Sequence, residues 1–126
     1  MITGAHFLFY SKDPEPDRAF FRDILGFRAV DVGHGWLIFA RPRTEVAIHP
    51  GSGDFVEPQG DHPMFGAVLD LMCDDLASFI KSMDAKNVEC SPVTKERWGI
   101  KTTMRVPSGG EIGVYQPTHP TALERA

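Results

Sequence analysis

One arrangement of segments occurs twice along this chain, at a constant distance. A strand-like run ends at Asp13, a helical stripe of apolar residues follows, and Gly26 stands where a helix needs a left-handed last residue. The same order returns with Asp74 and Asn87, each of which lies 61 residues after its counterpart. This spacing indicates that the chain consists of two copies of one module.

The first copy begins with a strand. Residues 2–10 alternate, with Phe7 and Phe9 on one face and His6 and Tyr10 on the other, which is the two-residue period of a strand. After the helix that Asp13 begins, we expect three short strands, over 28–32, 36–41 and 45–49, with His34 and Gly35 in the turn between the first two.

The second copy repeats this order after a stretch rich in Gly, Pro and Asp. We expect a strand over 67–72, a helix from Asp74 to Asn87, and strands over 88–91, 100–106 and 111–116, with Ser108, Gly109 and Gly110 in the last turn. The single domain, 1–126, therefore divides into module one (1–50), a linker (51–65), module two (66–117) and a C-terminal tail (118–126).

A sheet with one helix on its back leaves its second face free, and two such sheets enclose a cleft when they curl toward each other. The sequence therefore predicts an α+β fold of two tandem βαβββ modules, which form a curled antiparallel sheet around a cleft with the helices on the outside. Alternation places on the cleft side His6, Tyr10, His49, Asp70, Glu111 and Tyr115. With Trp36 and Trp98 as further flat surfaces, these residues predict a ligand-binding site for a small molecule.

Charge and hydropathy exclude other classes of function. Thirteen basic residues against seventeen acidic ones give a net charge of −4, and nucleic-acid binding needs clustered Lys and Arg instead. No apolar run reaches the roughly 20 residues that span a bilayer, so we expect no membrane partner. The first residues do not have the pattern of a secretory signal, which favours the cytoplasm.

Four runs carry a resemblance to a known family. His6–Asp13, Leu25–Phe27, Leu71–Leu76 and Val106–Ile112, in this order and spacing, resemble motifs of the glyoxalase / bleomycin-resistance / extradiol-dioxygenase (vicinal oxygen chelate) superfamily. The resemblance extends over residues 2–117 and implies the βαβββ fold and a homodimer. It does not select a reaction, because the superfamily contains lyases, isomerases, dioxygenases and drug-sequestering proteins.

The resemblance also implies where a metal would lie. Metalloenzymes of the superfamily take one ligand from each of four strands, and His6 matches the first position, but the other three fall at Ala47, Val68 and Gly113, which offer no ligating side chain. A set shifted by two residues along the strands consists of His6, His49, Asp70 and Glu111. We therefore expect no cofactor, with a divalent metal (Zn, Ni, Fe or Mn) bound by His6, His49 and Glu111 as the alternative.

Two functions follow from these residues. The first is a small-molecule-binding protein with a mostly degenerate metal site, which sequesters an aromatic or planar ligand. The alternative is a metal-dependent lyase or isomerase similar to lactoylglutathione lyase, or an extradiol dioxygenase, with Glu111 as the catalytic residue that moves a proton. The sequence leaves open the identity of the ligand and whether the modules pair within one chain or between chains.

Overall fold

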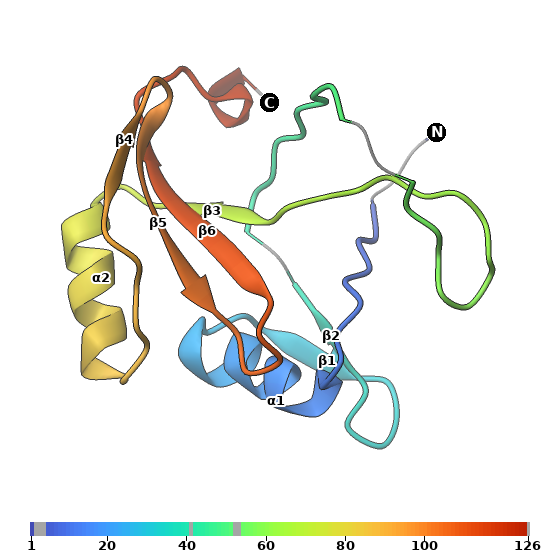
Figure 1. Ribbon diagram of the computed structural model, residues 1–126. Coiled ribbons are helices and arrows are strands. Elements are labelled where there is room, and N and C mark those ends of the chain that lie inside the picture. The colour runs from blue at the N-terminus through green and yellow to red at the C-terminus, as the bar shows by residue number, and fades with distance from the viewer. Residues whose placement is uncertain (2–4, 41, 52–53, 126) are drawn as a thin grey trace.

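The computed structural model (Figure 1) describes residues 1, 5–40, 42–51 and 54–125. The first part of the predicted strand over 2–10, the last residue of the one predicted over 36–41, two linker residues (52–53) and the last tail residue lie outside the described ranges. The architecture is α+β, with a two-stranded sheet, a four-stranded sheet and helices that lie on the outside, as the sequence predicts. No helix in the described part of the chain is long and apolar enough to cross a membrane.

The first half of the chain forms a helix followed by a hairpin. Helix α1 spans Pro14–Ala19 and continues as the wider turn η1, Phe20–Ile24. Strands β1 (Ala29–Asp31) and β2 (Leu37–Phe39) pair antiparallel. The predicted helix and hairpin are therefore confirmed, with shorter strands.

Residues with positive φ lie before this hairpin and in its turn. Gly26 has φ +73° after η1, and the turn between β1 and β2 holds His34 at +53° and Gly35 at +82°. Both turn residues thus adopt the positive φ that a tight hairpin turn requires. Asp13 stands before α1 as predicted, but its side chain forms no capping hydrogen bond; its backbone N–H instead donates to Ser11 Oγ at 3.0 Å.

The second half of the chain contains the larger sheet. Along the chain, this half forms β3 (Asp70–Met72), α2 (Leu76–Ala85), β4 (Thr94–Glu96), β5 (Gly99–Arg105) and β6 (Glu111–Pro117), followed by the short 3₁₀ turn η2 (Ala122–Arg125). The strand order is β3-β6-β5-β4, and the sheet is antiparallel except for the pair β3–β6, which is parallel.

Three sequence predictions for this half need correction. The helix is capped by Asp75 rather than Asp74, because it is the Asp75 carboxylate that accepts from the Ser78 N–H at 3.0 Å. The strand predicted over 88–91 is reduced to one bridge, between Cys90 and Met104. The edge strand β4 was missed, because its polar sequence Thr-Lys-Glu shows no apolar alternation.

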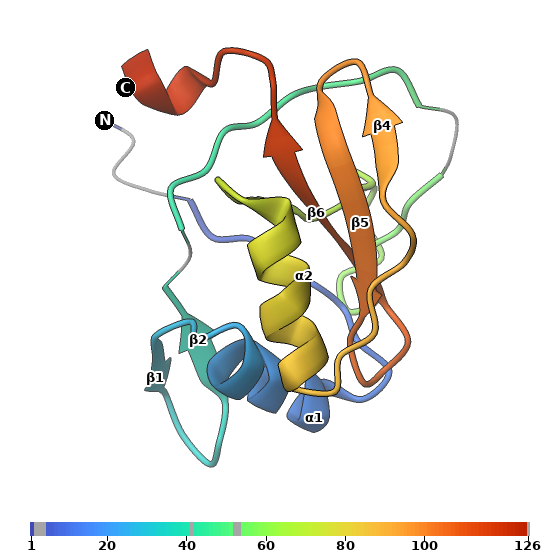
Figure 2. The same ribbon diagram turned by 90° about the vertical axis from the view of Figure 1, so that its left-hand side faces the viewer.

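The core lies between the helices and one face of the four-stranded sheet (Figure 2). Leu76 and Met83 of α2 pack against the buried side chains of β5 and β6, and Phe20 of η1 joins the same cluster. Its other buried members are Met104, Val106, Ile112 and Val114. Because α2 covers this face and η1 packs at its end, the opposite face of the sheet is left without a helix in the described part of the chain.

Two predicted strands of module one do not form. Residues 5–10 and 42–50 have no strand partner, and both predicted faces of the first segment are exposed, Phe7 and Phe9 as well as Leu8 and Tyr10. The strand predictions are therefore wrong for the described residues 5–10 and for 45–49. Alternation describes only the local pattern of a segment, whereas a strand also needs the hydrogen-bonding edge of a neighbour.

Candidate functional site

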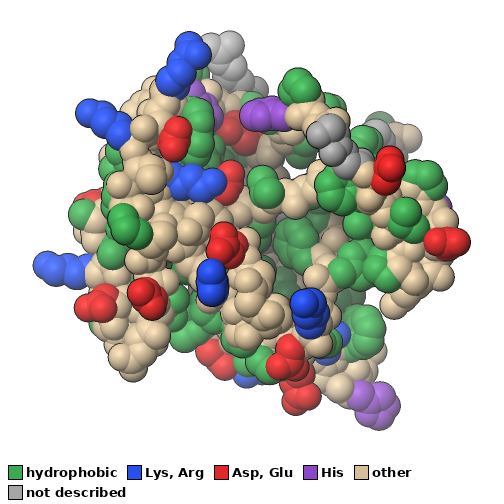
Figure 3. Space-filling model, in the orientation of Figure 1, with side chains coloured by type: hydrophobic (Ala, Val, Ile, Leu, Met, Phe, Trp, Pro, Cys, Tyr) green, Lys and Arg blue, Asp and Glu red, His purple; other side chains and the backbone are tan. Residues whose placement is uncertain are grey.

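The face of the four-stranded sheet that points away from the helices carries a group of polar and aromatic side chains. Ile112 and Val114 of β6 face the core, so Glu111, Gly113 and Tyr115 lie on the opposite side of the strand. Figure 3 shows a hollow in the molecule with hydrophobic side chains along it, and in Figure 1 segments 5–10 and 54–65 lie across from this face of the sheet.

Asp70 and Lys101 form an ion pair on this face. The register places Asp70 of β3 beside Gly113 of β6, and Lys101 Nζ lies 3.3 Å from Asp70 Oδ1. A Cβ at position 113 would overlap the Asp70 carboxylate and lie 2.8 Å from Lys101 Cε. The bare backbone of Gly113 is therefore what gives the ion pair its place on the sheet.

Two aromatic side chains border the ion pair. The rings of Trp98 and Tyr115 meet edge to face with centroids 4.9 Å apart, and Lys101 Nζ lies 5.6 Å from the centre of the Trp98 ring. Burial, and after it the negative charges of Glu45 and Asp70, raise the pKa of Tyr115. Its phenol thus remains protonated at neutral pH and can donate a hydrogen bond. We call Asp70, Trp98, Lys101, Gly113 and Tyr115 the sheet-face site.

The C-terminal tail and module one meet at the edge of this site. The ring of His119 stacks on Tyr115, with Nε2 3.2 Å from the tyrosine hydroxyl and 4.0 Å from Glu45 Oε1. The other oxygen of Glu45 accepts from the backbone N–H of Ala122 at 2.7 Å. Glu45 of segment 42–50 therefore lies near the site and is held there by its contacts with the tail.

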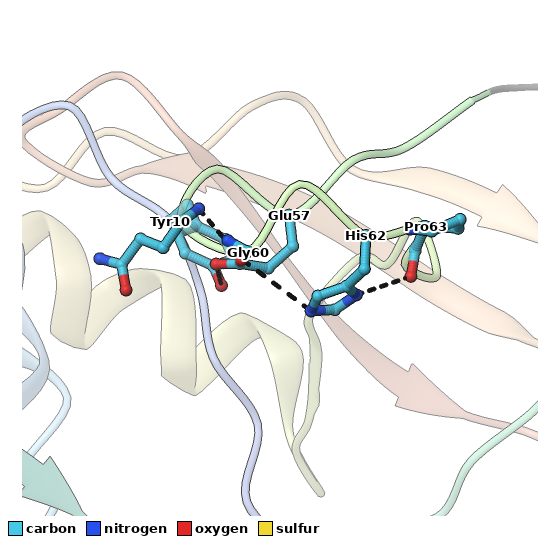
Figure 4. A network of polar contacts seen from close by, with 6 residues as sticks. Tyr10, Glu57, Gly60, His62 and Pro63 are labelled. Carbon is cyan, nitrogen blue, oxygen red and sulfur yellow. Dashed lines mark hydrogen bonds and ion pairs between the residues drawn. The ribbon is translucent and has the colours of Figure 1, made fainter.

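Tyr10 takes part in a separate network in the linker (Figure 4). Its hydroxyl donates to Glu57 Oε1 at 2.5 Å, and the second oxygen of Glu57 accepts from the backbone N–H groups of Gln59 and Gly60. The imidazole of His62 points at the same carboxylate from 3.9 Å. The hydrogen bond to Glu57, with a little burial, raises the pKa of Tyr10. This contact attaches segment 5–10 to the linker and uses the hydroxyl that we expected in the ligand site.

The remaining predicted site residues lie apart from the sheet-face site. His6 and His49 are exposed in segments without strand partners, and Trp36 lies in the β1–β2 hairpin beneath the guanidinium of Arg18, 4.6 Å from its ring centre. Glu111 is on the same sheet face but pairs with Arg105 at 3.4 Å. Of the predicted binding residues, the structure thus brings together Asp70, Trp98 and Tyr115.

The described residues do not fit a metal ion in this arrangement. Nowhere among them do three or more His, Cys, Asp or Glu side chains gather closely enough to hold one. Ala47, Val68 and Gly113 offer no donor where the resemblance implies one, and His6, His49 and Glu111 remain predicted ligands that are not brought together. No metal-dependent step can be assigned to these side chains.

Sequence reasoning missed Lys101, Glu45 and His119. Lys101 sits between Ile100 and Thr102, both on the core side, so the alternation of β5 contained a signal for its position. No such signal existed for Glu45 and His119. The tail that contains His119 has no periodic pattern, and the contact between the two residues joins positions far apart in the sequence.

Comparison of the chain with known proteins identifies its fold. No family model matches the sequence, and no curated protein matches it. Solved structures do match over nearly the whole chain. One is TnmS3, an antibiotic binding protein from Streptomyces sp. CB03234, with 20% identity and a TM-score of 0.60 over 94% of this chain and 99% of that one.

Two further structures agree with this result. Lactoylglutathione lyase from Agrobacterium tumefaciens has 16% identity and a TM-score of 0.61 over 90% of this chain and 92% of its own. A glyoxalase/bleomycin resistance protein from Streptomyces sp. CB03234 has 20% identity and a TM-score of 0.51 over 84% and 93%. At these identities the likeness shows the fold alone.

Proposed function

Starting from a glyoxalase/bleomycin-resistance type of fold, we propose that this protein binds a small planar aromatic molecule at the sheet-face site. The observation that carries the proposal is the grouping of Trp98 and Tyr115 with the charged pair Asp70–Lys101 on the sheet face that no helix covers. Aromatic walls with a few polar groups are typical of small-molecule sites. The solved structure of an antibiotic binding protein with the same fold supports this choice.

Each side chain has a physical role in such binding. Trp98 offers a flat surface for stacking, Tyr115 supports that ring edge to face, and Asp70 and Lys101 offer one charge of each sign. These interactions hold and orient a ligand without transferring an electron or a bond. We therefore propose capture of the ligand as the activity.

Fluorescence titration tests this proposal. The chain has two tryptophans, so a Trp36→Phe variant reports on Trp98 alone. We expect acridine, a planar aromatic probe, to quench this emission saturably, and Trp98→Ala to weaken binding by about 30-fold, as for the loss of a central aromatic contact of about 2 kcal/mol. Equal affinity in Trp98→Ala and the wild type, measured by calorimetry, would rule out the site.

A homodimer and a cytoplasmic location complete the proposal. Large hydrophobic side chains are strongly exposed in module one, the linker and the first residues of module two, among them Ile48 (88%), Phe65 (90%) and Val68 (86%). A second copy that covers this surface removes it from water, which is the main source of stability in a permanent dimer.

Light scattering after size-exclusion chromatography tests the dimer. We expect twice the 14.0 kDa mass of the chain for the wild type and for Val93→Asp, which places one such charge on an exposed residue of module two. The double variant Ile48→Asp/Phe65→Asp is expected to elute as a monomer, because two charges would have to be buried at the interface. A monomeric wild type at micromolar concentration contradicts the dimer.

A metal-dependent enzyme is the second candidate, supported by the fold shared with lactoylglutathione lyase. Elemental analysis of protein purified without chelator tests it, with His6→Ala as the matched variant. Stoichiometric metal that is lost in His6→Ala favours the enzyme over the binding protein.

A further inference from the structure

The ammonium group of Lys101 lies in surroundings that suit a cation. It has an aromatic ring on one side, with Nζ 5.6 Å from the centre of Trp98, and a carboxylate on the other, 3.3 Å away at Asp70. A ring face and a carboxylate together attract a positive charge by the ring quadrupole and by direct charge attraction. The position of Lys101 therefore indicates that this part of the site favours a positively charged group.

Neighbouring contacts fix the aromatic wall of this position, and a glycine leaves room for the acidic wall. Trp98 is held edge to face by Tyr115, and its carbonyl accepts from the Thr118 N–H at 2.9 Å. The Asp70 carboxylate rests on the bare backbone of Gly113, where a Cβ would displace it. The ring therefore stays in place when the lysine moves, and the carboxylate keeps an open position on the sheet.

The surrounding charges favour a positive ligand. Glu45 and Asp70 both act on Tyr115, and after burial their charges are what raise its pKa. Farther along the same sheet face, Arg105 is already paired with Glu111 at 3.4 Å. Once Lys101 withdraws, the group around Trp98 and Tyr115 carries an excess of negative charge.

Lys101 itself is weakly held. Its side chain is 26% exposed and that of Asp70 is 29% exposed, and ion pairs with this access to water contribute little to stability. The long flexible stem of lysine also allows the ammonium to turn into solvent. A ligand cation therefore competes with Lys101 at small cost.

We propose that Trp98 and Asp70 form a cation subsite that Lys101 occupies in the free protein, and that the ligand is a planar aromatic cation whose positively charged nitrogen displaces the lysine. This inference rests on the proposed function and names the chemical class of its ligand. In this account Lys101 determines specificity, since only a positively charged group replaces what it offers to Asp70 and Trp98.

Two probes of the same shape and opposite charge test the subsite. We choose 9-aminoacridine, a cation at neutral pH, and acridine-9-carboxylate, an anion, and measure their affinities by calorimetry. The variants are Lys101→Met and Asp70→Asn, with Lys95→Met and Asp84→Asn as matched controls. Lys95 pairs in register with Ile100, which packs on the core side, so its side chain lies on the other face of the sheet, and Asp84 lies in α2.

The expected result is an opposite response to the two substitutions. If Lys101 occupies the subsite for roughly nine-tenths of the time, Lys101→Met tightens binding of the cation about tenfold. Asp70→Asn weakens it, by about threefold or more, since the carboxylate attraction is removed. Lys95→Met and Asp84→Asn leave the affinity unchanged, and circular dichroism verifies that all four variants are folded.

The failures of the two proposals are distinguishable. Equal binding of both probes that is lost in Trp98→Ala retains the proposed function and overturns the cation subsite. Weaker binding of the cation in Lys101→Met, or preference for the anion, also overturns it. If neither probe binds the wild type or Lys101→Met, the proposed function fails and the subsite with it.

Discussion

The two halves of this chain have similar sequence patterns but differ in how many of their predicted strands pair and how much apolar surface they bury. The second half pairs its strands and buries Leu76, Met104 and Val114 almost completely. The first half forms a helix and a short hairpin but leaves segments 5–10 and 42–50 outside any sheet, with Phe7 and Ile48 exposed. The comparison teaches that alternation predicts which residues share a face, while strand formation depends on a neighbouring edge.

The difference also assigns separate roles to the halves. The second half provides the rigid sheet on which Asp70, Lys101 and Tyr115 are positioned, whereas the first half provides an apolar surface and, through Glu45, one carboxylate near the site. We infer that the second half binds the ligand and that the first half contacts a second copy.

The largest expected effect is a difference between the halves in how much a leucine contributes to the free energy of unfolding. Leu76→Ala removes a side chain that is 1% exposed at the centre of the core, and we expect a loss of about 3 kcal/mol in the free energy of unfolding. Leu8→Ala is the matched change in the first half, where the leucine is 67% exposed. Urea unfolding of dilute protein should show almost no effect of Leu8→Ala. Similar losses in both variants would contradict the difference between the halves.

A second prediction concerns the contact that joins the halves. Asp17 of α1 accepts hydrogen bonds from Ser11 and from both the N–H and the hydroxyl of Ser108 in the β5–β6 turn, at 2.6–2.9 Å. We expect Asp17→Asn to destabilise the protein by about 2 kcal/mol at pH 7, as for hydrogen bonds to a charged acceptor. Asp23→Asn is the control, because Asp23 pairs only with the exposed Arg22 beside it.

The pH dependence of this effect follows from the Asp17 carboxyl group. Burial acts to raise its pKa, but the hydrogen bonds from Ser108 and Ser11 outweigh burial and lower it below the ordinary value. Its stabilising effect is therefore complete above the unfolded pKa of about 3.9 and is lost as the pH falls through the lower pKa of the folded state. Unfolding curves of wild type and Asp17→Asn should converge below about pH 4, and a constant difference down to pH 2 would refute this origin.

The smallest expected effect on stability sharpens the role of the sheet face. Gly113→Ala introduces a Cβ where the Asp70 carboxylate and Lys101 Cε now lie, and both are distal atoms of side chains that can move. We expect a cost below about 1 kcal/mol in thermal unfolding, since surface side chains relax easily. Binding of 9-aminoacridine should nevertheless weaken severalfold, because the carboxylate leaves its place. Gly110→Ala, whose new Cβ would meet Val106 at an ordinary 3.4 Å, is the control for binding.

The sequence predicted the fold well where residues act locally. Gly26 and Asn87 both have positive φ, as predicted for helix ends, and the faces of β3 and β6 were assigned correctly, with Leu71 and Val114 toward the core. The helix cap was predicted one residue too early, at Asp74, because two acidic residues stand side by side and either one suits the pattern. The boundaries of the two modules and of the linker stay predictions.

The site was less predictable, because it depends on contacts between distant residues. The sequence singled out Asp70 and Tyr115 from the alternation of their strands and Trp98 as an aromatic residue. Lys101 and Glu45 gain their roles only from neighbours across the sheet and from the tail. Tyr10 and Trp36 looked equivalent to Tyr115 and Trp98 in the sequence. The hydrogen bond to Glu57 and the contact with Arg18 set them apart in space.

The two tryptophans, one in each half, provide the most direct test of ligand binding at the sheet face. Each gives one indole N–H signal in a nitrogen-edited NMR spectrum, and Trp36→Phe assigns them. On titration with 9-aminoacridine we predict that the Trp98 signal shifts saturably while the Trp36 signal stays in place. A shift of Trp36 alone, or no shift of Trp98 at saturating probe, would contradict the assignment of the site to the second half.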